Sequence, residues 1–161
     1  MHLIWKPDEW RKFIANFITN LPKKIEDAAV RIHDYIRVTP LEYSPYYSQI
    51  SGAEVWLKLE NFQVTGSFKA RGAFNKTLCL DDHQRSVGCV TASSGNHGAA
   101  SAHAMRELGI NGLVFLPEKT STIKVEAIRR AGCEVRFFGK DGVDTENYAV
   151  SYTHLRAHET R

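Results

Sequence analysis

The second half of the chain alternates short apolar runs with helical patterns, and this alternation restricts the fold more than any other feature. Three runs suit buried strands: "VGCVTA" (87–92), "GLVFLP" (112–117) and "CEVRFFG" (133–139). Between them lie two stretches whose apolar residues recur at helical spacing, 96–109 and 121–132. Strands that alternate with helices pair in parallel through right-handed crossovers. We therefore predict three parallel strands with helices between them.

Each of the two helical stretches has one face that we expect to be buried. In the first stretch this face consists of Ala100, Ala104, Met105 and Leu108. In the second stretch it consists of Ile123, Ala127 and Ala131. Arg129 and Arg130 occupy the last turn of the second stretch and Gly132 follows, which is typical of a helix end.

The first thirty or so residues also show helical spacing, which Pro22 interrupts. The apolar residues recur at steps of three and four: Trp10, Phe13, Ile14, Phe17, Ile18 and Leu21. We interpret this stripe as a core face or a partner face, with a membrane-surface face as the alternative. A second helical piece covers about 25–36, and Pro40 and Pro45 then impose extended or turn structure.

Residues 54–60, "EVWLKLE", alternate strictly between polar and apolar side chains. This is the period of a strand with one buried face. We therefore predict a half-buried strand, with Val55, Leu57 and Leu59 on the same side.

Composition argues against several classes of protein. The chain has 161 residues and a formal net charge of +3, and its basic residues are scattered among acidic ones, so nucleic acid binding has little support. The opening "MHLIWKPDEW" lacks the apolar core of a signal peptide, and no apolar stretch approaches the roughly 18 residues of a membrane helix. Cys79, Cys89 and Cys133 have no CxxC or metal-type spacing, so we interpret them as reduced thiols of a cytoplasmic protein. His97 and His103 do not share a helix face, so no metal pair is predicted.

The stretch "TGSFKARG" (65–72) places Lys69 after a glycine turn and an aromatic ring, where a helical pattern begins. A surface lysine is better placed at the other end of a helix, because the N-terminus carries partial positive charge. Either this placement has no role, or it serves to disfavour the ammonium form of the side chain. We assign Arg71 to helix-surface charge.

A second motif, "TASSGNHGAA" (91–100), joins a predicted strand to the helix after it. Ligands of open α/β sheets bind outside the carboxyl ends of the strands, and N–H groups at a helix start bind anions. Ser93, Ser94 and Asn96 add donors at the same place. The alternative is an N-capped helix after a tight turn. The motif is not GxGxxG and the chain has no GxxxxGK, so neither a dinucleotide site nor a P-loop is supported.

Together these motifs resemble the fold-type-II pyridoxal-phosphate enzymes: threonine ammonia-lyase (threonine dehydratase), serine racemase and their relatives. "RVTPL", "VWLKLENFQVTGSFKARGAFN", "ASSGNHGAASAHA" and "EAIRRAGCEV" follow one another in the family's order. The resemblance runs from about Ile25 to about Ala149. It implies an α/β fold of two domains, with parallel sheets flanked by helices.

The resemblance also implies roles for individual residues. Lys69 would form the Schiff base with pyridoxal phosphate, because a helix N-terminus and partial desolvation leave a free amine able to attack the aldehyde. Phe68 would pack against the pyridine ring, and Asn96 would hydrogen-bond the phenolic oxygen. Ser94 would face the α-carbon opposite Lys69, as a second catalytic residue. The substrate carboxylate would be held by Ser93, Ser94, Gly95, Asn96 and His97. No metal is implied.

The reaction implied by the resemblance is loss of water from L-threonine or L-serine, which gives a 2-oxo acid and ammonia, with Lys69 as the base. Serine racemase is the main alternative, because Ser94 is able to reprotonate the opposite face. Threonine synthase and hydroxyaspartate ammonia-lyase are further alternatives. An alternative of another class is that the chain is an inactive fragment, which acts only as a binding module. The parent enzyme is expected to be a cytoplasmic homo-oligomer that binds a small amino acid and neither nucleic acid nor membrane.

Four segments are expected along the chain. Residues 1–24 would be an N-terminal extension, 25–88 the first part of a larger cofactor-binding domain, and 89–149 an incomplete smaller α/β domain. Residues 150–161 depart from the family pattern, and we expect this tail to be artefactual. Family members run to about twice this length, and the chain has no glycine-rich loop for the cofactor phosphate. We therefore expect a chain truncated in its second half and inactive by itself.

Overall fold

The computed structural model describes the backbone of residues 7–159 and the side chains of residues 14–15 and 17–153. Three strands form one sheet in the order β3-β4-β5: β3 (Cys89–Ala92), β4 (Gly112–Leu116) and β5 (Glu134–Phe137). Both pairs of neighbouring strands are parallel, with Thr91 of β3 opposite Val114 of β4. The prediction of three parallel strands is therefore confirmed.

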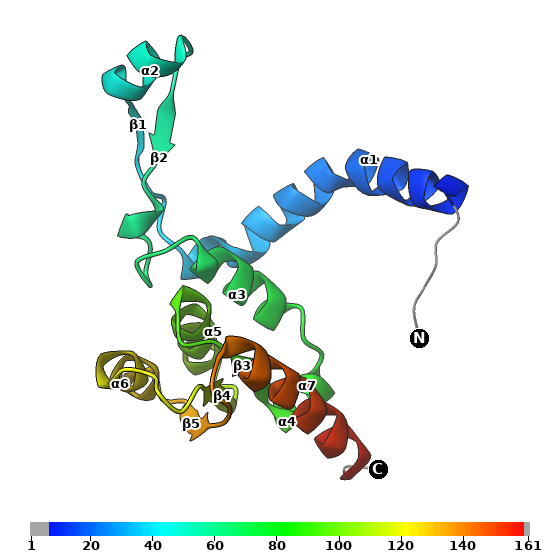
Figure 1. Ribbon diagram of the computed structural model, residues 1–161. Coiled ribbons are helices and arrows are strands. Elements are labelled where there is room, and N and C mark those ends of the chain that lie inside the picture. The colour runs from blue at the N-terminus through cyan, green and yellow to red at the C-terminus, as the bar shows by residue number, and fades with distance from the viewer. Residues whose placement is uncertain (1–6, 160–161) are drawn as a thin grey trace.

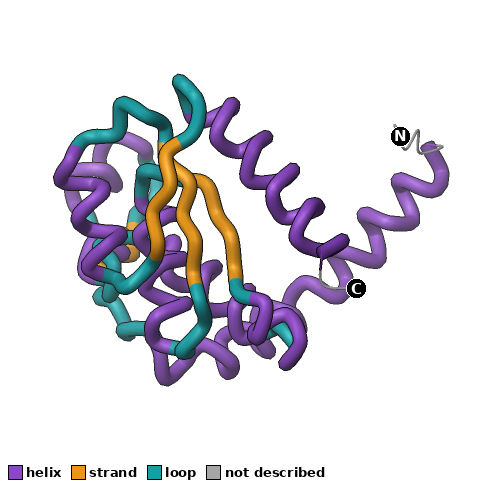
Figure 2. Tube along the Cα trace, turned by 90° about the horizontal axis from the view of Figure 1, so that it is seen from below, coloured by secondary structure: helices purple, strands orange, loops and turns teal. Residues whose placement is uncertain are grey.

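Helices cover both faces of this sheet (Figure 2). Three helices follow the strands: α5 (Asn96–Glu107), α6 (Thr122–Arg130) and α7 (Gly142–Glu159). Val114 and Leu116 of β4 belong to a buried cluster with side chains of α5 and α6. Leu113 and Phe115, which point the other way, pack toward α7. The central strand is therefore buried on both faces, as a parallel sheet requires.

The buried face of α5 is the predicted one, but that of α6 is predicted only in part. On α5 the side chains of Ala100, Ala104 and Met105 are almost completely buried. At the end of α6, Ala131 is buried as predicted. Ile123 is 80% exposed and Ala127 is also exposed, whereas Val125 and Ile128 are buried. A valine and an isoleucine bury more apolar area than an alanine does, so the helix turns them toward the core.

The two helices directly before the sheet in the chain are α3 (Lys69–Leu78) and α4 (Asp82–Val87). α3 packs along α5, where Phe74 shares a buried cluster with Ala100 and Ala104. The ring of Phe74 also meets His103 edge to face, with ring centroids 5.6 Å apart. Small alanine side chains allow the two helices to approach closely at this contact.

An antiparallel ribbon, made of residues 41–58, projects away from these helices (Figure 1). It contains β1 (Leu41–Tyr43), α2 (Pro45–Ser51) and β2 (Trp56–Lys58). The predicted strand over 54–60 is too long, because β2 covers only Trp56–Lys58. On its predicted buried side, Val55 and Leu59 are half-buried as expected, whereas Leu57 is 38% exposed. β2 pairs only with β1 in the described part of the chain, and no helix in that part covers its faces.

The described part of the chain begins with two helical elements: α1 (Pro7–Ile32) and η1 (His33–Tyr35). Pro22 lies inside α1, so the predicted interruption is wrong. A proline removes one backbone hydrogen bond and kinks a helix without always ending it, and Figure 1 shows α1 bent. Phe17 is 43% and Ile18 60% exposed, so they are not core residues here. The side chains of Trp10 and Phe13 lie outside the described ones. Within residues 7–159, no helix is long and apolar enough to cross a membrane.

Candidate active site

Lys69 is the first residue of α3, and Gly66 shapes the turn before it. Gly66 has a φ of 70°, in the left-handed region that favours glycine, and its N–H donates to the carbonyl of Gln63 at 2.8 Å. Lys69 is exposed, with its Nζ 5.3 Å from the centroid of the Phe68 ring. Phe68 is itself 60% exposed. The amine is therefore at a helix start, as predicted, but the partial desolvation that we expected is absent among the described residues.

Residues 93–97, which we call the serine turn, connect the end of β3 to the start of α5. Gly95 occupies the N-cap position of α5, and no side chain caps the helix there. The hydroxyl of Ser93 instead accepts from the N–H of Gly95 at 3.2 Å. Of the alternative interpretation, an N-capped helix after a tight turn, the tight turn is present but the side-chain cap is not. The first N–H groups of α5 have no capping side chain, which leaves them suited to an anion.

Gly98 brings the first turn of α5 against the serine turn. A Cβ added at this glycine would lie 1.9 Å from the carbonyl oxygen of Ser93, far closer than real contacts allow. Any other residue at 98 would push the two segments apart. The shape of the serine turn therefore depends on the missing side chain at this position.

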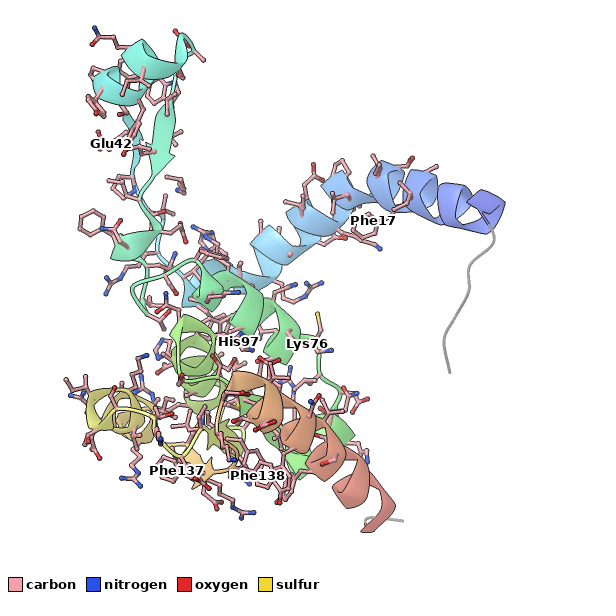
Figure 3. The ribbon with its side chains drawn as sticks, viewed as in Figure 1. Phe17, Glu42, Lys76, His97, Phe137 and Phe138 are labelled. Atoms are coloured by element: carbon pink, nitrogen blue, oxygen red, sulfur yellow. The ribbon has the colours of Figure 1, made fainter. Side chains whose placement is uncertain are left out.

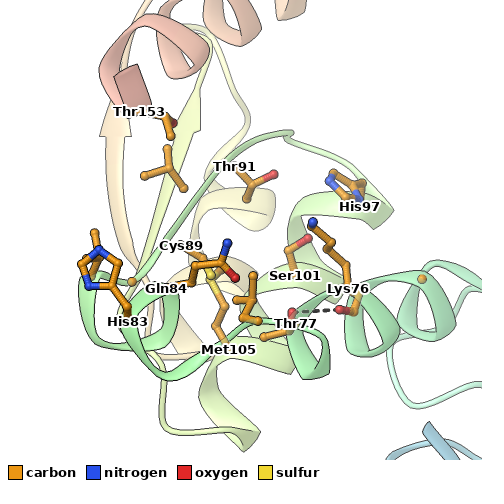
Figure 4. A pocket seen from close by; sticks show the side chains of 16 residues that line it. Lys76, Thr77, His83, Gln84, Cys89, Thr91, His97, Ser101, Met105 and Thr153 are labelled. Carbon is orange, nitrogen blue, oxygen red and sulfur yellow. Dashed lines mark hydrogen bonds between the residues drawn. The ribbon is translucent and has the colours of Figure 1, made fainter. Parts of the chain in front are cut away.

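The two motifs lie at the same end of a pair of helices that run in the same direction. Thr77 of α3 and Ser101 of α5 line the same cavity (Figure 4). Further along, Leu80 after α3 packs with the buried cluster that contains Met105 of α5. Later residues of α3 thus lie near later residues of α5, so the two helices run in the same direction. The fold therefore places the two predicted motifs, Lys69 at the start of α3 and the serine turn, at the same end of the α3–α5 pair.

A polar cluster that the sequence analysis missed holds the segment before Lys69. Arg71 donates from Nε to one Glu60 oxygen at 2.9 Å and from Nη2 to the other at 2.7 Å. Thr39 donates its hydroxyl to the same carboxylate at 2.6 Å. The hydrogen bond from Arg71, aided by that from Thr39, lowers the pKa of Glu60 to about 2. Arg71 is therefore part of an ion pair, and its assignment to plain helix-surface charge is wrong.

Two buried hydroxyls beside Lys69 have no hydrogen-bond partner in the described chain, those of Thr65 and Ser67. A buried polar atom left without a partner costs about 1–3 kcal/mol. Natural structures keep such atoms where a ligand, a water or another part of the protein pairs with them. The two hydroxyls are therefore able to bind a further polar group at the turn before Lys69.

A cavity of about 710 Å³ lies along the unpaired edge of β3, next to the serine turn rather than within it (Figure 4). Its lining includes Thr91, Ser101 and Lys76, and of the predicted site residues only His97. Lys69 does not line it. The cavity is therefore a neighbour of the predicted site and does not coincide with it. Figure 3 labels Lys76 and His97 in the wider view.

The cysteines and histidines do not form a second chemical centre among the described residues. No group of three or more His, Cys, Asp or Glu residues in the described chain is placed to hold a metal ion. Cys79, Cys89 and Cys133 are free, as predicted. Burial raises the pKa of the Cys89 and Cys133 thiols, which makes these two residues poor nucleophiles.

Comparisons with known proteins agree with this fold. Residues 32–159 match the family model described as pyridoxal-phosphate dependent enzyme. The catabolic L-threonine dehydratase of Staphylococcus aureus (strain USA300) is 43% identical over 125 residues, which are 77% of this chain and 36% of that protein. The structure of maize serine racemase has a TM-score of 0.75 at 34% identity and covers 83% of this chain and 40% of its own. The structure of threonine deaminase isoform 2 from Solanum lycopersicum has a TM-score of 0.77 at 29% identity. The match covers 85% of this chain and 40% of that one.

A parallel sheet between helices, with a lysine and an uncapped helix start at one end of paired helices, defines an α/β enzyme of fold type II. The chain belongs to the pyridoxal-phosphate-dependent enzyme family. It spans only 36% of the length of the curated relative and 40% of each of the two solved structures.

The residues present fit the aldehyde end of pyridoxal phosphate. Lys69 supplies an accessible primary amine, and the first turn of α5 supplies N–H groups without a capping side chain. The side chain of Asn96 is exposed beside them. Gly98 provides the close approach that a compact turn needs around a ligand.

Proposed function

We propose that this chain is the amino-terminal part of an ammonia-lyase that removes water from L-threonine or L-serine and releases ammonia and a 2-oxo acid. The proposal is supported by the position of Lys69 and the serine turn at the same end of the α3–α5 pair. The 43% identity to a threonine dehydratase supports the choice of reaction.

Each residue of the site has a separate task in this proposal. Bound pyridoxal phosphate supplies an electron sink, which makes the α-proton of an attached amino acid acidic. The Nζ of Lys69 would hold the cofactor at its aldehyde carbon and would act as the base that takes the α-proton of the substrate. The ring of Phe68 would pack against the pyridine, and the side-chain amide of Asn96 would donate to the phenolic oxygen.

The serine turn binds the substrate carboxylate in this proposal. The first N–H groups of α5 point at the anion, and the hydroxyls of Ser93 and Ser94 add donors. Gly95 and His97 contribute backbone at the same place. The turn thereby fixes which bond of the α-carbon faces the base on Lys69.

Serine racemisation is a second candidate activity. Ser94 is half-buried in the serine turn, where a hydroxyl is suited to return a proton to the face opposite Lys69. The likeness to maize serine racemase, at 34% identity and a TM-score of 0.75, supports this candidate. Measuring D-serine and 2-oxo acid together, from the same L-serine reaction, separates the two activities.

The proposed role of Lys69 is tested by chemical trapping. Pyridoxal phosphate is added to the purified chain, the mixture is reduced with borohydride, and the modified peptide is mapped by mass spectrometry. We expect modification at Lys69 well above that at Lys76, which is also exposed and lies on the same helix. Equal modification of the two lysines would contradict the assignment. Ammonia release from threonine and serine by the whole protein then tests the reaction.

A further inference from the structure

We propose that Glu60 and Arg71 are positioning residues, which hold the first turn of α3 so that Lys69 faces the serine turn. The inference rests on the proposed role of Lys69. The two side chains lie 11 residues apart in sequence and enclose both the turn around Gly66 and Lys69 itself. Their contact therefore closes a loop that contains the reactive amine.

The contact between the two side chains is a two-pronged one. Nε and Nη2 of Arg71 reach separate oxygens of Glu60, at 2.9 Å and 2.7 Å. A guanidinium that binds a carboxylate with two donors fixes orientation as well as distance. The side chain of Glu60 is 16% exposed and that of Arg71 34%, so the pair is partly shielded from solvent. This geometry sets it apart from the mobile pairs of an open surface.

The carboxylate of Glu60 is anchored in turn to the base of the ribbon. Thr39, which is only 4% exposed, donates its hydroxyl to Glu60 at 2.6 Å. The ammonium of Lys58 donates to the carbonyl of Thr39 at 2.6 Å. The carboxylate of Glu60 is therefore held by Thr39 as well as by Arg71.

A neighbouring glutamine ties the same loop to the extended segment before β1, which also contains Thr39. Gln63 is 2% exposed, and its side-chain oxygen accepts from the N–H of Arg37 at 2.8 Å. Its side-chain nitrogen donates back to the carbonyl of Arg37 at 3.0 Å. The backbone before Lys69 is thus held by these polar contacts together with the packing of Val64 against the buried cluster that contains Phe74.

The pair acts on Lys69 through the backbone and not by contact. Two residues along a helix correspond to a rotation of roughly 200°, so the side chains of Lys69 and Arg71 leave α3 in nearly opposite directions. α3 also has no side-chain cap at Phe68, so nothing of that kind fixes its first turn. The N–H of Arg71 donates to the carbonyl of Phe68 at 3.1 Å, which links the ion pair to the residue before the lysine.

The test compares variants of the pair with a matched variant elsewhere. Arg71→Gln and Glu60→Gln remove the ion pair, Arg71→Lys keeps the charge without the two-pronged contact, and Glu60→Arg with Arg71→Glu reverses it. Glu126→Gln is the control, because it breaks an exposed pair with Arg129 within α6. The first measurement is the ratio of borohydride-trapped pyridoxal phosphate on Lys69 to that on Lys76. The second is hydrogen exchange at the amides of residues 66–71.

We expect Arg71→Gln to lower the trapping ratio by about tenfold, since small displacements of a reactive group have large effects on rate. Exchange in residues 66–71 should become several-fold faster, while exchange in β4 stays unchanged. The trapping ratio of Arg71→Lys should fall between those of Arg71→Gln and the parent chain. The reversed pair should recover part of this ratio, and Glu126→Gln should have the same ratio as the parent chain. If Arg71→Gln does not fold, Arg71→Lys carries the comparison.

An unchanged ratio and unchanged exchange in folded variants would overturn the proposal. If the parent chain shows no preference for Lys69, the proposed function fails, and exchange in residues 66–71 still decides whether the pair orders the loop. If exchange quickens equally in β4 and in the loop, the pair is a general stabiliser and the positioning role is refuted.

Discussion

Gly98 and Ser93 approach each other so closely that a single added carbon would collide with the backbone. The Cβ of an alanine at 98 would lie 1.9 Å from the carbonyl oxygen of Ser93 and 3.0 Å from its carbonyl carbon. The obstacle is backbone, which cannot rotate away as a flexible side chain can. The serine turn and the first turn of α5 therefore form one rigid unit.

Gly98→Ala should destabilise the chain by about 1–3 kcal/mol and displace the serine turn. Gly72→Ala is a suitable control, since nothing lies within 4 Å of the Cβ it would add and the residue is within α3. That control should stabilise the chain by about 0.5–1 kcal/mol, because alanine favours a helix over glycine. Urea denaturation measures both variants. Equal stability of the two variants would show that the turn relaxes without cost.

The stability of the chain should fall as the pH drops from about 4.5 toward 2. The hydrogen bond from Arg71 lowers the folded pKa of Glu60 to about 2 from 4.5, so the unfolded chain takes up its proton first. The contribution of the pair is present above pH 4.5 and is lost as the pH falls through the folded pKa. After allowance for solvent screening we expect a loss on the order of 1–2 kcal/mol. Glu60→Gln should flatten this part of the curve, and a curve of unchanged slope would contradict the assignment.

In the whole protein, Lys69→Ala should abolish the visible absorbance of bound pyridoxal phosphate. The proposal gives this side chain the covalent link to the cofactor, and alanine has no amine. Lys76→Ala is the control, because Lys76 is exposed on the same helix but lies beyond the first turn. An undiminished band that survives dialysis in the Lys69 variant would rule out the assignment.

Ser94→Ala should reduce racemisation far more than elimination in the whole protein, if the protein carries out both reactions. Racemisation needs a proton returned from the face opposite Lys69, whereas elimination needs only its removal. The two products are measured from L-serine in one reaction. Equal losses would show that Ser94 serves only to hold the carboxylate.

Phe115→Ala should cost about 3–5 kcal/mol in the free energy of unfolding. Phe115 is 2% exposed, and its ring lies 5.2 Å from that of Tyr148 and 5.3 Å from that of Tyr152, between centroids. Ile123→Ala removes an 80% exposed side chain from α6 and should change stability by less than about 0.5 kcal/mol. Denaturant midpoints distinguish the two. A small effect at Phe115 would mean that α7 does not pack on the sheet in solution.

The strand–helix half of the fold could be predicted because its signals are local. Each strand is a short apolar run, each helix has its own period, and Gly132 ends α6 with a φ of 83°, as expected. The face of α6 could not be settled in the same way. Ile123 and Ile128 are both large and apolar, and only the position of the helix on the sheet decides which of them is buried.

The site could be predicted only in part. Lys69 and the serine turn are each marked by glycines at a helix start, so a sequence pattern identifies them. The contact of Glu60 with Arg71 has no such mark, because it depends on how the intervening loop folds back on itself. Glu60 precedes the TGSFKARG motif and Arg71 lies within it, 11 residues later, which is not a spacing that suggests a pair.

The ribbon meets the rest of the chain at Thr39 and Glu60, and its own strands are largely exposed. Segments with few buried contacts are the first to open in local unfolding, well below the free energy needed to unfold the whole chain. An opening of the ribbon would withdraw Thr39 from the carboxylate that receives Arg71. The order of the loop before Lys69 is thus thermodynamically linked to the closure of the ribbon. A molecule that binds and stabilises the closed ribbon would also reduce the motion of this loop.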